Sequence, residues 1–367
     1  GTPADSPDES RFRQARGYAG LNVSSFGGAL TSRVSLTYLA NRRDYSSAPD
    51  GAVDFGYRGT GWRFDYQGKL AATEPLDLLF GYTHDAPSYR FFGFGSNEDH
   101  DADTDSVYGM AVLRPFARAT LTGGVRHDEH SQFGGVTTFG ANANIGLPDE
   151  KTRLRASFGQ GFRTPSLYQL YDAFSGNRAL LPERSESFDV GVDRTIAEGR
   201  GQVSLTLFNR NTRNQIDYSP VTFTYGNIAR TRARGAEIEV TLSPIDGFDL
   251  GLAYSLVDTR NRAPGAAFNR HLARRPVHGF TVLMDQAWSF GLATGATLRL
   301  ASDSVDPTAP GGEIDGYVLL DLRASIPLGD RFELYGRVEN VFNAVYETAY
   351  GYSTYGRAAY AGVRVKL

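Results

Sequence analysis

The chain has 367 residues, no cysteine and a formal net charge of −3 at pH 7. The lack of cysteine excludes a disulfide framework and thiolate metal sites, and the lack of a basic excess argues against nucleic acid as a partner. Aromatic residues make up 12% of the chain and there are 42 glycines, a composition that favours strands and turns over helices.

Candidate strands follow one another along the whole chain. No run of about 18 apolar residues interrupts them, so no transmembrane helix is predicted. Seventeen strands are expected, beginning near Gly17, Leu30, Asp54, Leu76, Asp103, Arg118, Val136, Lys151, Glu186, Gln202, Phe223, Phe248, Arg275, Gly291, Asp315, Arg331 and Gly351.

The connections between these strands alternate between short and long. Short ones fall at 27–28, 74–75, 115–116, 148–150, 198–201, 244–247, 287–289 and 328–330. Long ones include roughly 84–102, 161–185, 256–274 and 341–353. Bacterial outer-membrane barrels have short periplasmic turns and longer extracellular loops. The pattern therefore predicts an all-β fold, an antiparallel transmembrane β-barrel.

Within the strands, apolar and polar residues alternate. Ile238 and Val240 share one face of their strand, and Glu237 and Glu239 share the other, because successive side chains point to opposite faces. Long strands of this kind indicate lipid outside and water inside. A mean hydropathy of −0.34 is compatible with this, since half of each strand faces water. Aromatic residues beside short turns fit an interfacial girdle: Phe116, Trp288 and Phe290.

An acidic stretch, NEDHDADTD at 97–105, is the main candidate for metal chemistry. Its carboxylates are hard oxygen ligands that could hold calcium: Asp99, Asp101, Asp103 and Asp105. The glycine and the terminal glutamate of an EF-hand are missing, and a solvated acidic loop is the alternative. No nucleophile–base constellation stands out anywhere, so an enzyme is not expected.

Two long motifs resemble those of TonB-dependent outer-membrane receptors. The first is FGQGFRTPSLYQLYDAFSGNRALLPERSESFDVGVD, at 158–193, and its matching residues are Phe162, Arg163, Pro165, Asn177, Leu180, Pro182, Glu183 and Ser185. The second is LYGRVENVFNAVYETAYGYSTYGRAAYAGVRVKL at the C-terminus, which includes Asn340 and Phe342. The resemblance covers essentially the whole chain and is nearest to the cobalamin and siderophore receptors.

This resemblance implies a 22-stranded barrel in the outer membrane of a Gram-negative bacterium, with a lumen plugged by an N-terminal domain. Its partners would be outer-membrane lipid, the barrel assembly machinery and TonB, which contacts a short box before the plug. Neither box nor plug is visible in 1–367. Seventeen is an odd number, whereas bacterial single-chain barrels have even numbers. The chain is therefore expected to be a barrel domain that lacks N-terminal strands.

The resemblance also implies uptake of a scarce, bulky nutrient, either cobalamin or a ferric siderophore, held by loops and the upper lumen. Aromatic faces suit such corrin or metal-chelate ligands, and the candidates are Tyr89, Phe91, Phe92, Tyr168, Tyr171, Phe174, Tyr350 and Tyr352. An aromatic belt with ordinary loop packing is the alternative for each. No histidine lies between Arg163 and Asn177, which disfavours haem. Calcium orders loops in cobalamin receptors, but through ligands in earlier hairpins.

Two other classes of protein remain open at this point. A passive porin-like channel would share the strand pattern but would have no plug. A soluble all-β binding protein would share the period-two alternation but would not need detergent for extraction.

Overall fold

The computed structural model describes residues 8–48 and 51–366, and it is almost entirely antiparallel β-sheet. The first strands are β1 (Glu9–Ser25), β2 (Leu30–Ser46), β3 (Phe55–Thr73), β4 (Leu76–Gly93), β5 (Ser96–Asp101), β6 (Thr104–Leu113), β7 (Ala119–His130), β8 (Gly134–Gly146) and β9 (Thr152–Arg163). The later strands are β10 (Glu183–Ile196), β11 (Gly201–Ser219), β12 (Thr224–Ile245), β13 (Phe248–Asn261), β14 (His278–Ala287), β15 (Ala293–Ala301), β16 (Ser304–Val305), β17 (Glu313–Ile314), β18 (Tyr317–Leu328), β19 (Phe332–Glu339) and β20 (Ala358–Val365).

In residues 8–48 and 51–366, helical structure is confined to the connections between strands. One α-helix, α1 (Leu167–Tyr171), lies in the long loop between β9 and β10. The 3-10 turns are η1 (Phe26–Gly28), η2 (Ala197–Gly199) and η3 (Pro310–Gly312). In the described part of the chain, no helix has the length and apolar character needed to cross a membrane.

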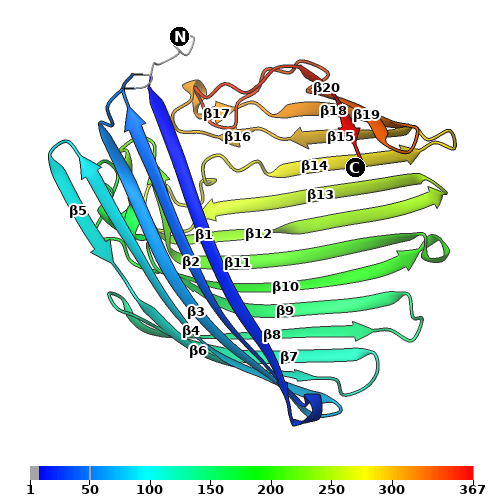
Figure 1. The fold of residues 1–367 in the computed structure, drawn as a ribbon, viewed down its shortest axis with the longest axis horizontal. Coiled ribbons are helices and arrows are strands. Elements are labelled where there is room, and N and C mark those ends of the chain that lie inside the picture. The colour runs from blue at the N-terminus through cyan, green and yellow to red at the C-terminus, as the bar shows by residue number, and fades with distance from the viewer. Residues whose placement is uncertain (1–7, 49–50, 367) are drawn as a thin grey trace.

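Among the described residues, the main sheet has 18 strands. Strands that follow one another along the chain pair with each other, except that β15 pairs with β18 across the β16–β17 hairpin and β5 pairs only with β4. Two short strands share one partner, because β4 pairs with β6 through 76–85 and with β5 through 88–93. If β5 and β6 are counted as one interrupted strand, the sheet has the predicted number of seventeen strands. The sheet curves strongly, so that β1 to β4 run obliquely to the stack of β7 to β15 (Figure 1). No pairing joins β1 to β20 among the described residues.

The outward face of the sheet carries rows of apolar side chains in register. One row crosses five strands, from β9 to β13, as Leu154, Val192, Leu205, Ile238 and Tyr254. Many large apolar side chains on this face remain exposed, for example Phe158 at 40% and Phe188 at 52%. A soluble monomer rarely exposes so large a contiguous apolar surface, whereas lipid covers it in a transmembrane barrel. This face argues against the soluble all-β alternative.

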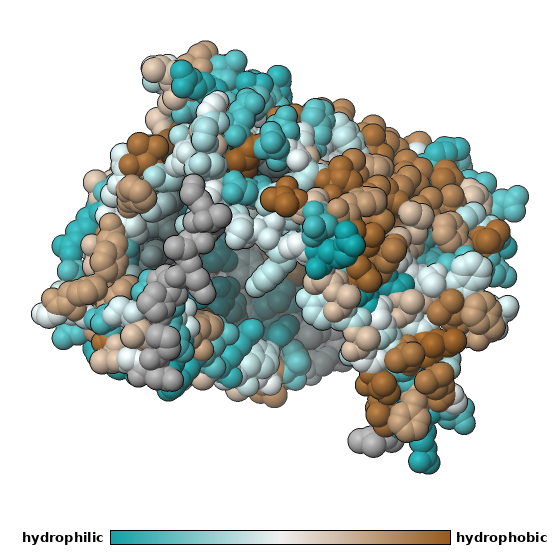
Figure 2. Space-filling view, turned by 90° about the horizontal axis from the view of Figure 1, so that it is seen from above, coloured by the Kyte–Doolittle hydropathy of each residue, from teal (hydrophilic) through white to brown (hydrophobic). Residues whose placement is uncertain are grey.

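The inward face is polar and many of its charges are paired. Asp193 forms ion pairs with both Arg153 and Arg155, each with a nitrogen–oxygen distance of 2.9 Å. Figure 2 shows the hollow bounded largely by hydrophilic and pale residues, with hydrophobic residues gathered on the outer surface. The predicted separation of a wet face and a lipid face is confirmed.

The eight predicted short turns all lie between consecutive strands of the sheet. The exposed girdle residues flank two of these turns, Phe116 at 115–116 and both Trp288 and Phe290 at 287–289. The prediction of a long loop at 84–102 was wrong. This segment is the end of β4 and all of β5, joined by a tight turn in which Phe94 and Gly95 have positive φ values of 50° and 76°. The strand predicted to start at Asp103 accordingly begins at Thr104, with β5 before it.

The C-terminal end of the chain differs from expectation in two places. The last strand begins at Ala358 and not near Gly351, so the preceding loop covers 340–357. A further long loop at 302–316 was missed, and it contains the small β16–β17 hairpin.

Two other strands begin earlier than predicted. The first strand begins at Glu9 and not near Gly17, and β10 begins at Glu183 and not near Glu186.

Candidate functional site

Aromatic side chains gather on the inward face where β3, β4 and the loop carrying α1 meet. We define this aromatic cluster as Phe55, Tyr57, Tyr89, Phe91, Tyr168 and Phe174. Residues 55 and 57 share one face of β3, and residues 89 and 91 share the same face of β4, since side chains alternate along a strand. The loop then places Tyr168 and Phe174 against these four.

Ring contacts bind the loop to the sheet. The ring centroid of Tyr168 lies 5.6 Å from that of Tyr57 and 6.2 Å from that of Tyr89, and Phe174 lies 5.2 Å from Phe55. Most of these pairs are edge-to-face, the arrangement that the quadrupoles of aromatic rings favour. Phe91 is 2% exposed and forms the centre of the packing. By contrast, Tyr168 and Phe174 remain 39% and 56% exposed.

A cavity of about 390 Å³ opens beside the cluster. Its wall includes Tyr57, Tyr89 and Tyr168 together with the polar residues Asp85 and His130. Among the described residues, the Tyr89 hydroxyl is buried and has no hydrogen-bond partner. Burial, together with the negative charge of Asp172, raises the pKa of Tyr168, so this phenol stays protonated and can donate a hydrogen bond at neutral pH.

The local sequence explains why α1 forms where it does. Ser166 is its N-cap and accepts a hydrogen bond from the backbone N–H of Gln169, while the Gln169 side chain accepts one from the backbone N–H of Ser166. This reciprocal capping box satisfies two otherwise free donors. Leu167 and Leu170 on the same short helix are buried, 8% and 3% exposed, which fixes α1 against the sheet.

The motif residues anchor both ends of this loop. Arg163, at the end of β9, makes a two-point ion pair with Glu183, at the start of β10, with nitrogen–oxygen distances of 2.6 and 3.2 Å. Glu183 also accepts the backbone N–H of Ile216 at 2.7 Å. Asn177 donates to the carbonyl of Tyr225 at 2.9 Å, and Leu180 is 2% exposed. Phe162, Pro165 and Pro182 lie at the strand ends and in the loop, as expected.

Asn340, from the C-terminal motif, organises the loop 340–357 from inside. Its side-chain amide donates to the carbonyls of Ala344 and Tyr355 and accepts the N–H of Ala344. Phe342 lies two residues further and is 60% exposed. Both residues lie at the end of β19 and the start of the loop, where the motif predicted them.

The structure brings together only part of the predicted ligand set. Tyr89, Phe91, Tyr168 and Phe174 meet in the aromatic cluster, whereas Tyr350 and Tyr352 lie in the separate loop 340–357. The assignment of residues 89, 91 and 92 to a loop was wrong, because all three lie on β4.

Two of the predicted ligand residues have other partners. Phe92 alternates to the outward face, where the guanidiniums of Arg42 and Arg58 lie over its ring. Tyr171 stacks on His100, with ring centroids 3.6 Å apart.

Sequence reasoning missed Phe55 and Tyr57, although they were within reach of a simple signal. They are spaced two apart at the start of β3, which places both rings on one face. The sequence did not reveal that β4 extends to Gly93 and lies beside them, because the loop predicted at 84–102 ends β4 too early.

The predicted calcium ligands are not gathered into a site. Asp99 pairs with Arg90, and Asp105 pairs with His84 and Tyr82. In the part of the chain that the structure describes, no group of three or more metal-ligating side chains is close enough to hold a metal ion. Calcium binding by this stretch stays a prediction, without a preformed site to support it.

A second organising centre, missed from the sequence, lies among the C-terminal loops. Its core is Asp306, whose side chain is fully buried. The carboxylate accepts hydrogen bonds from the Arg274 guanidinium at 2.8 Å, the Thr308 hydroxyl at 2.7 Å and the Tyr350 backbone N–H at 3.0 Å. We call this group the Asp306 hub. It joins three loops, 262–277, 302–316 and 340–357.

Burial alone would raise the pKa of Asp306, but the hydrogen bonds from Arg274, Thr308 and the backbone outweigh it and hold this pKa well below its usual range. The hub is therefore charged at neutral pH. A buried carboxylate is tolerated only when it is paired and hydrogen-bonded, and each of its donors comes from a loop that is thereby fixed.

Comparison with known proteins adds to this geometry. The family model described as "TonB dependent receptor-like, beta-barrel" matches residues 1–341. A curated relative, the vitamin B12 transporter BtuB of Vibrio vulnificus (strain YJ016), is 29% identical over 284 residues, which cover 75% of this chain and 44% of the relative.

Solved receptors share the fold. The ferric-catecholate import receptor Fiu from E. coli K12 superposes with a TM-score of 0.78 at 15% identity, covering 98% of this chain and 64% of that one. The ferric enterobactin receptor PfeA from Pseudomonas aeruginosa, a Q482A mutant in complex with enterobactin, gives 0.77 at 16% identity, covering 97% and 62%. The chain thus spans less than half of the curated relative and less than two thirds of these solved receptors.

Proposed function

Because the chain belongs to the family of TonB-dependent receptor β-barrels, which are receptors and transporters of the Gram-negative outer membrane, we propose that it serves the uptake of a bulky corrin or metal chelate. The aromatic cluster and its cavity would form the ligand-contacting part of the barrel. Uptake would be driven by TonB acting on a plug, as in complete receptors, and the barrel assembly machinery would insert the strands.

The observation that carries this proposal is the cavity beside the aromatic cluster. It combines three tyrosines on the inward face with a buried Tyr89 hydroxyl that has no partner among the described residues. Ligand sites are typically apolar and aromatic with a few unsatisfied polar groups placed to fix orientation. The exposed faces of Tyr168 and Phe174 leave room for a flat, conjugated ligand to stack.

The relatives favour a gated receptor over a passive channel. The curated relative is a vitamin B12 transporter and the solved neighbours are import receptors for ferric chelates. These proteins suggest two ligand classes for this chain, a corrin and a ferric catecholate.

Binding by the receptor purified from outer membranes tests the proposal. The probes are cyanocobalamin and ferric enterobactin, followed by quenching of intrinsic fluorescence. One of the two should bind, and Tyr168→Ala should weaken that binding about tenfold, since an aromatic contact contributes roughly 1–1.5 kcal/mol. Tyr352→Ala is the matched control, because Tyr352 is a loop tyrosine outside the cluster, and it should leave the affinity unchanged.

Two results would contradict this assignment. Binding of neither probe would remove the proposed ligand class, and an equal loss in Tyr352→Ala would move the site to the loop 340–357. Dependence on TonB is tested separately, by uptake of the bound probe in hosts with and without TonB. Equal uptake in both hosts would favour the porin-like channel.

A further inference from the structure

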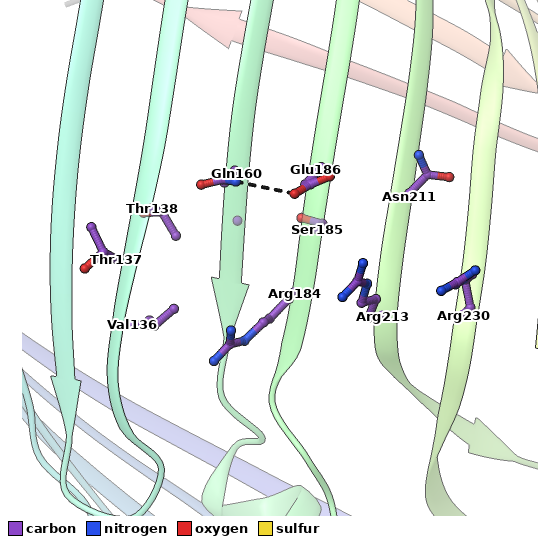
Figure 3. Close-up of a pocket in the computed structure, with 11 residues that line it drawn as sticks. Val136, Thr137, Thr138, Gln160, Arg184, Ser185, Glu186, Asn211, Arg213 and Arg230 are labelled. Atoms are coloured by element: carbon purple, nitrogen blue, oxygen red, sulfur yellow. Dashed lines mark hydrogen bonds between the residues drawn. The ribbon is translucent and has the colours of Figure 1, made fainter.

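A row of three arginines crosses adjacent strands on the outward face of the sheet. Arg184 on β10 lies directly opposite Arg213 on β11, and Arg213 lies directly opposite Arg230 on β12. All three share the face of Phe188 and Val190 by strand alternation. Figure 3 shows the three side chains side by side on one surface of the sheet, with Gln160 and Glu186 beside them.

These three guanidiniums have no acidic partner among the described residues. Every ion pair recorded there involves other basic side chains, and the nearby Glu186 instead accepts a hydrogen bond from Gln160 at 3.4 Å. Like charges directly opposite each other destabilise a sheet. The three arginines lie in one row, only about 4.8 Å apart from strand to strand. A bound anion would therefore relieve the repulsion between their guanidinium groups.

A cavity accompanies the row. It has a volume of about 460 Å³ and is lined by Arg184, Arg213 and Arg230 together with Gln160 and Asn211. Its polar wall offers hydrogen-bond donors from three arginines and two amides. Guanidiniums match phosphate oxygens in geometry and form charge-assisted hydrogen bonds with them.

A second row on another part of the barrel has the same arrangement. Arg13, Arg42, Arg58 and Arg90 lie opposite one another across β1 to β4. Two of them have carboxylate partners, Asp44 for Arg42 and Asp99 for Arg90, so this row is partly neutralised. It nevertheless repeats the first row on strands that are far away in the sequence.

In both rows, one arginine lies four residues from a large exposed aromatic residue of the lipid face. Arg58 lies four residues beyond Trp62 on β3, and Arg184 lies four residues from Phe188 on β10, in each case towards the long loops. Four residues correspond to about 13 Å along a strand, or about 10 Å of height once strand tilt is included. Aromatic girdles mark the membrane interface, so the arginines reach the headgroup layer of the outer leaflet.

We propose that Arg184, Arg213 and Arg230 form a binding site for the phosphate of a phosphorylated lipid headgroup in the outer leaflet. The site lies on the lipid-facing side of the wall, whereas the nutrient site lies on the inward face. It rests on the membrane placement of the barrel but does not depend on which nutrient is taken up. Its function is to fix the barrel to the leaflet beneath the long loops.

The test measures lipid bound to the detergent-purified receptor by native mass spectrometry. The probes are bisphosphorylated lipid A and its chemically dephosphorylated form, and the variant is Arg184→Gln/Arg213→Gln. The charge-matched control is Arg200→Gln/Arg331→Gln, at two turns on the opposite rim. The phosphorylated probe should bind at least tenfold more weakly to the first variant and within twofold of the native protein to the control.

The outcomes separate the possible sources of the anion. Equal binding of the dephosphorylated lipid, or an equal loss in the control, overturns the proposal. Tight binding of inorganic phosphate without preference for the lipid assigns the site to a free anion and also overturns it. Heat-modifiable migration on a gel verifies that each variant is folded, which is expected because the substitutions remove repulsion. Nutrient binding should be unchanged in both variants, so a failure here is distinct from a failure of the proposed function.

Discussion

The aromatic cluster and the Asp306 hub both fix long loops to the barrel, but by opposite physical means. The cluster buries Phe91 and packs rings edge to face, with the loop of α1 laid against two strands. The hub buries a single carboxylate and collects its hydrogen bonds from three loops.

This difference has a consequence for how each region can act. The apolar packing of the cluster does not depend on a titrating group. The outer rings of the cluster, Tyr168 and Phe174, can give up contacts with their neighbours and contact a ligand instead. A buried charge cannot lose a partner without a large cost. The cluster is therefore suited to bind, and the hub is suited to hold its loops in one arrangement.

The largest effect is expected when the centre of the aromatic cluster is emptied. Phe91→Ala removes a side chain that is 2% exposed and should cost about 4 kcal/mol locally. Hydrogen exchange should rise in the loop 164–182 and stay unchanged in the loop 340–357. The control is Phe290→Ala at an exposed turn. Faster exchange in both loops would show that the two regions are not independent.

The next largest effect is expected from the hub. Asp306→Asn keeps the shape of the side chain but leaves Arg274 without its counter-charge, at a cost of about 3 kcal/mol. Hydrogen exchange should rise together in the loops 262–277, 302–316 and 340–357, because each of them donates a hydrogen bond to the Asp306 carboxylate. Asp303→Asn, in the same loop but exposed, is the control. A rise limited to 302–316 would contradict the role of Asp306 as a joint between loops.

Acidification should act on the hub and spare the cluster. The pKa of Asp306 is lowered in the folded state, so its contribution is fully present above the unfolded-state value of about 4 and is lost as the pH falls below it towards the folded-state pKa. The exchange difference between the native protein and Asp306→Asn should therefore shrink below about pH 4. A constant difference down to pH 2 would contradict this mechanism.

A smaller effect is expected at the ion pair between Arg163 and Glu183, which is the polar anchor of the loop that carries α1. Arg163→Gln breaks the two-point pair with Glu183, which is partly exposed to solvent and should contribute about 1 kcal/mol. The loop 164–182 should exchange slightly faster while ring packing persists. Arg178→Gln, which breaks a more exposed pair with Glu98, should have less effect. If Arg163→Gln accelerates hydrogen exchange in this loop as much as Phe91→Ala does, the ion pair and not the ring packing controls the loop.

The architecture could be predicted from the amino-acid sequence alone. Period-two alternation separates the two faces of every strand, so Ile238 and Glu239 could be assigned to lipid and lumen without coordinates. The short turns were equally readable, because glycine, proline and acidic residues mark tight reversals. The motif residues Arg163, Glu183 and Asn340 were found as well, through the resemblance of their motifs to those of TonB-dependent receptors.

The contacts between residues across the lumen and between loops become visible only in the folded chain. Tyr57 and Tyr168 are far apart in the sequence, and their contact depends on how the α1 loop folds back on β3. Asp306 carries no local signal, because its partners come from three different loops. The arginine rows depend on strand register, which side-chain alternation leaves open by any even number of residues. Local patterns fix the face of a side chain, but pairing and loop folding fix its neighbours.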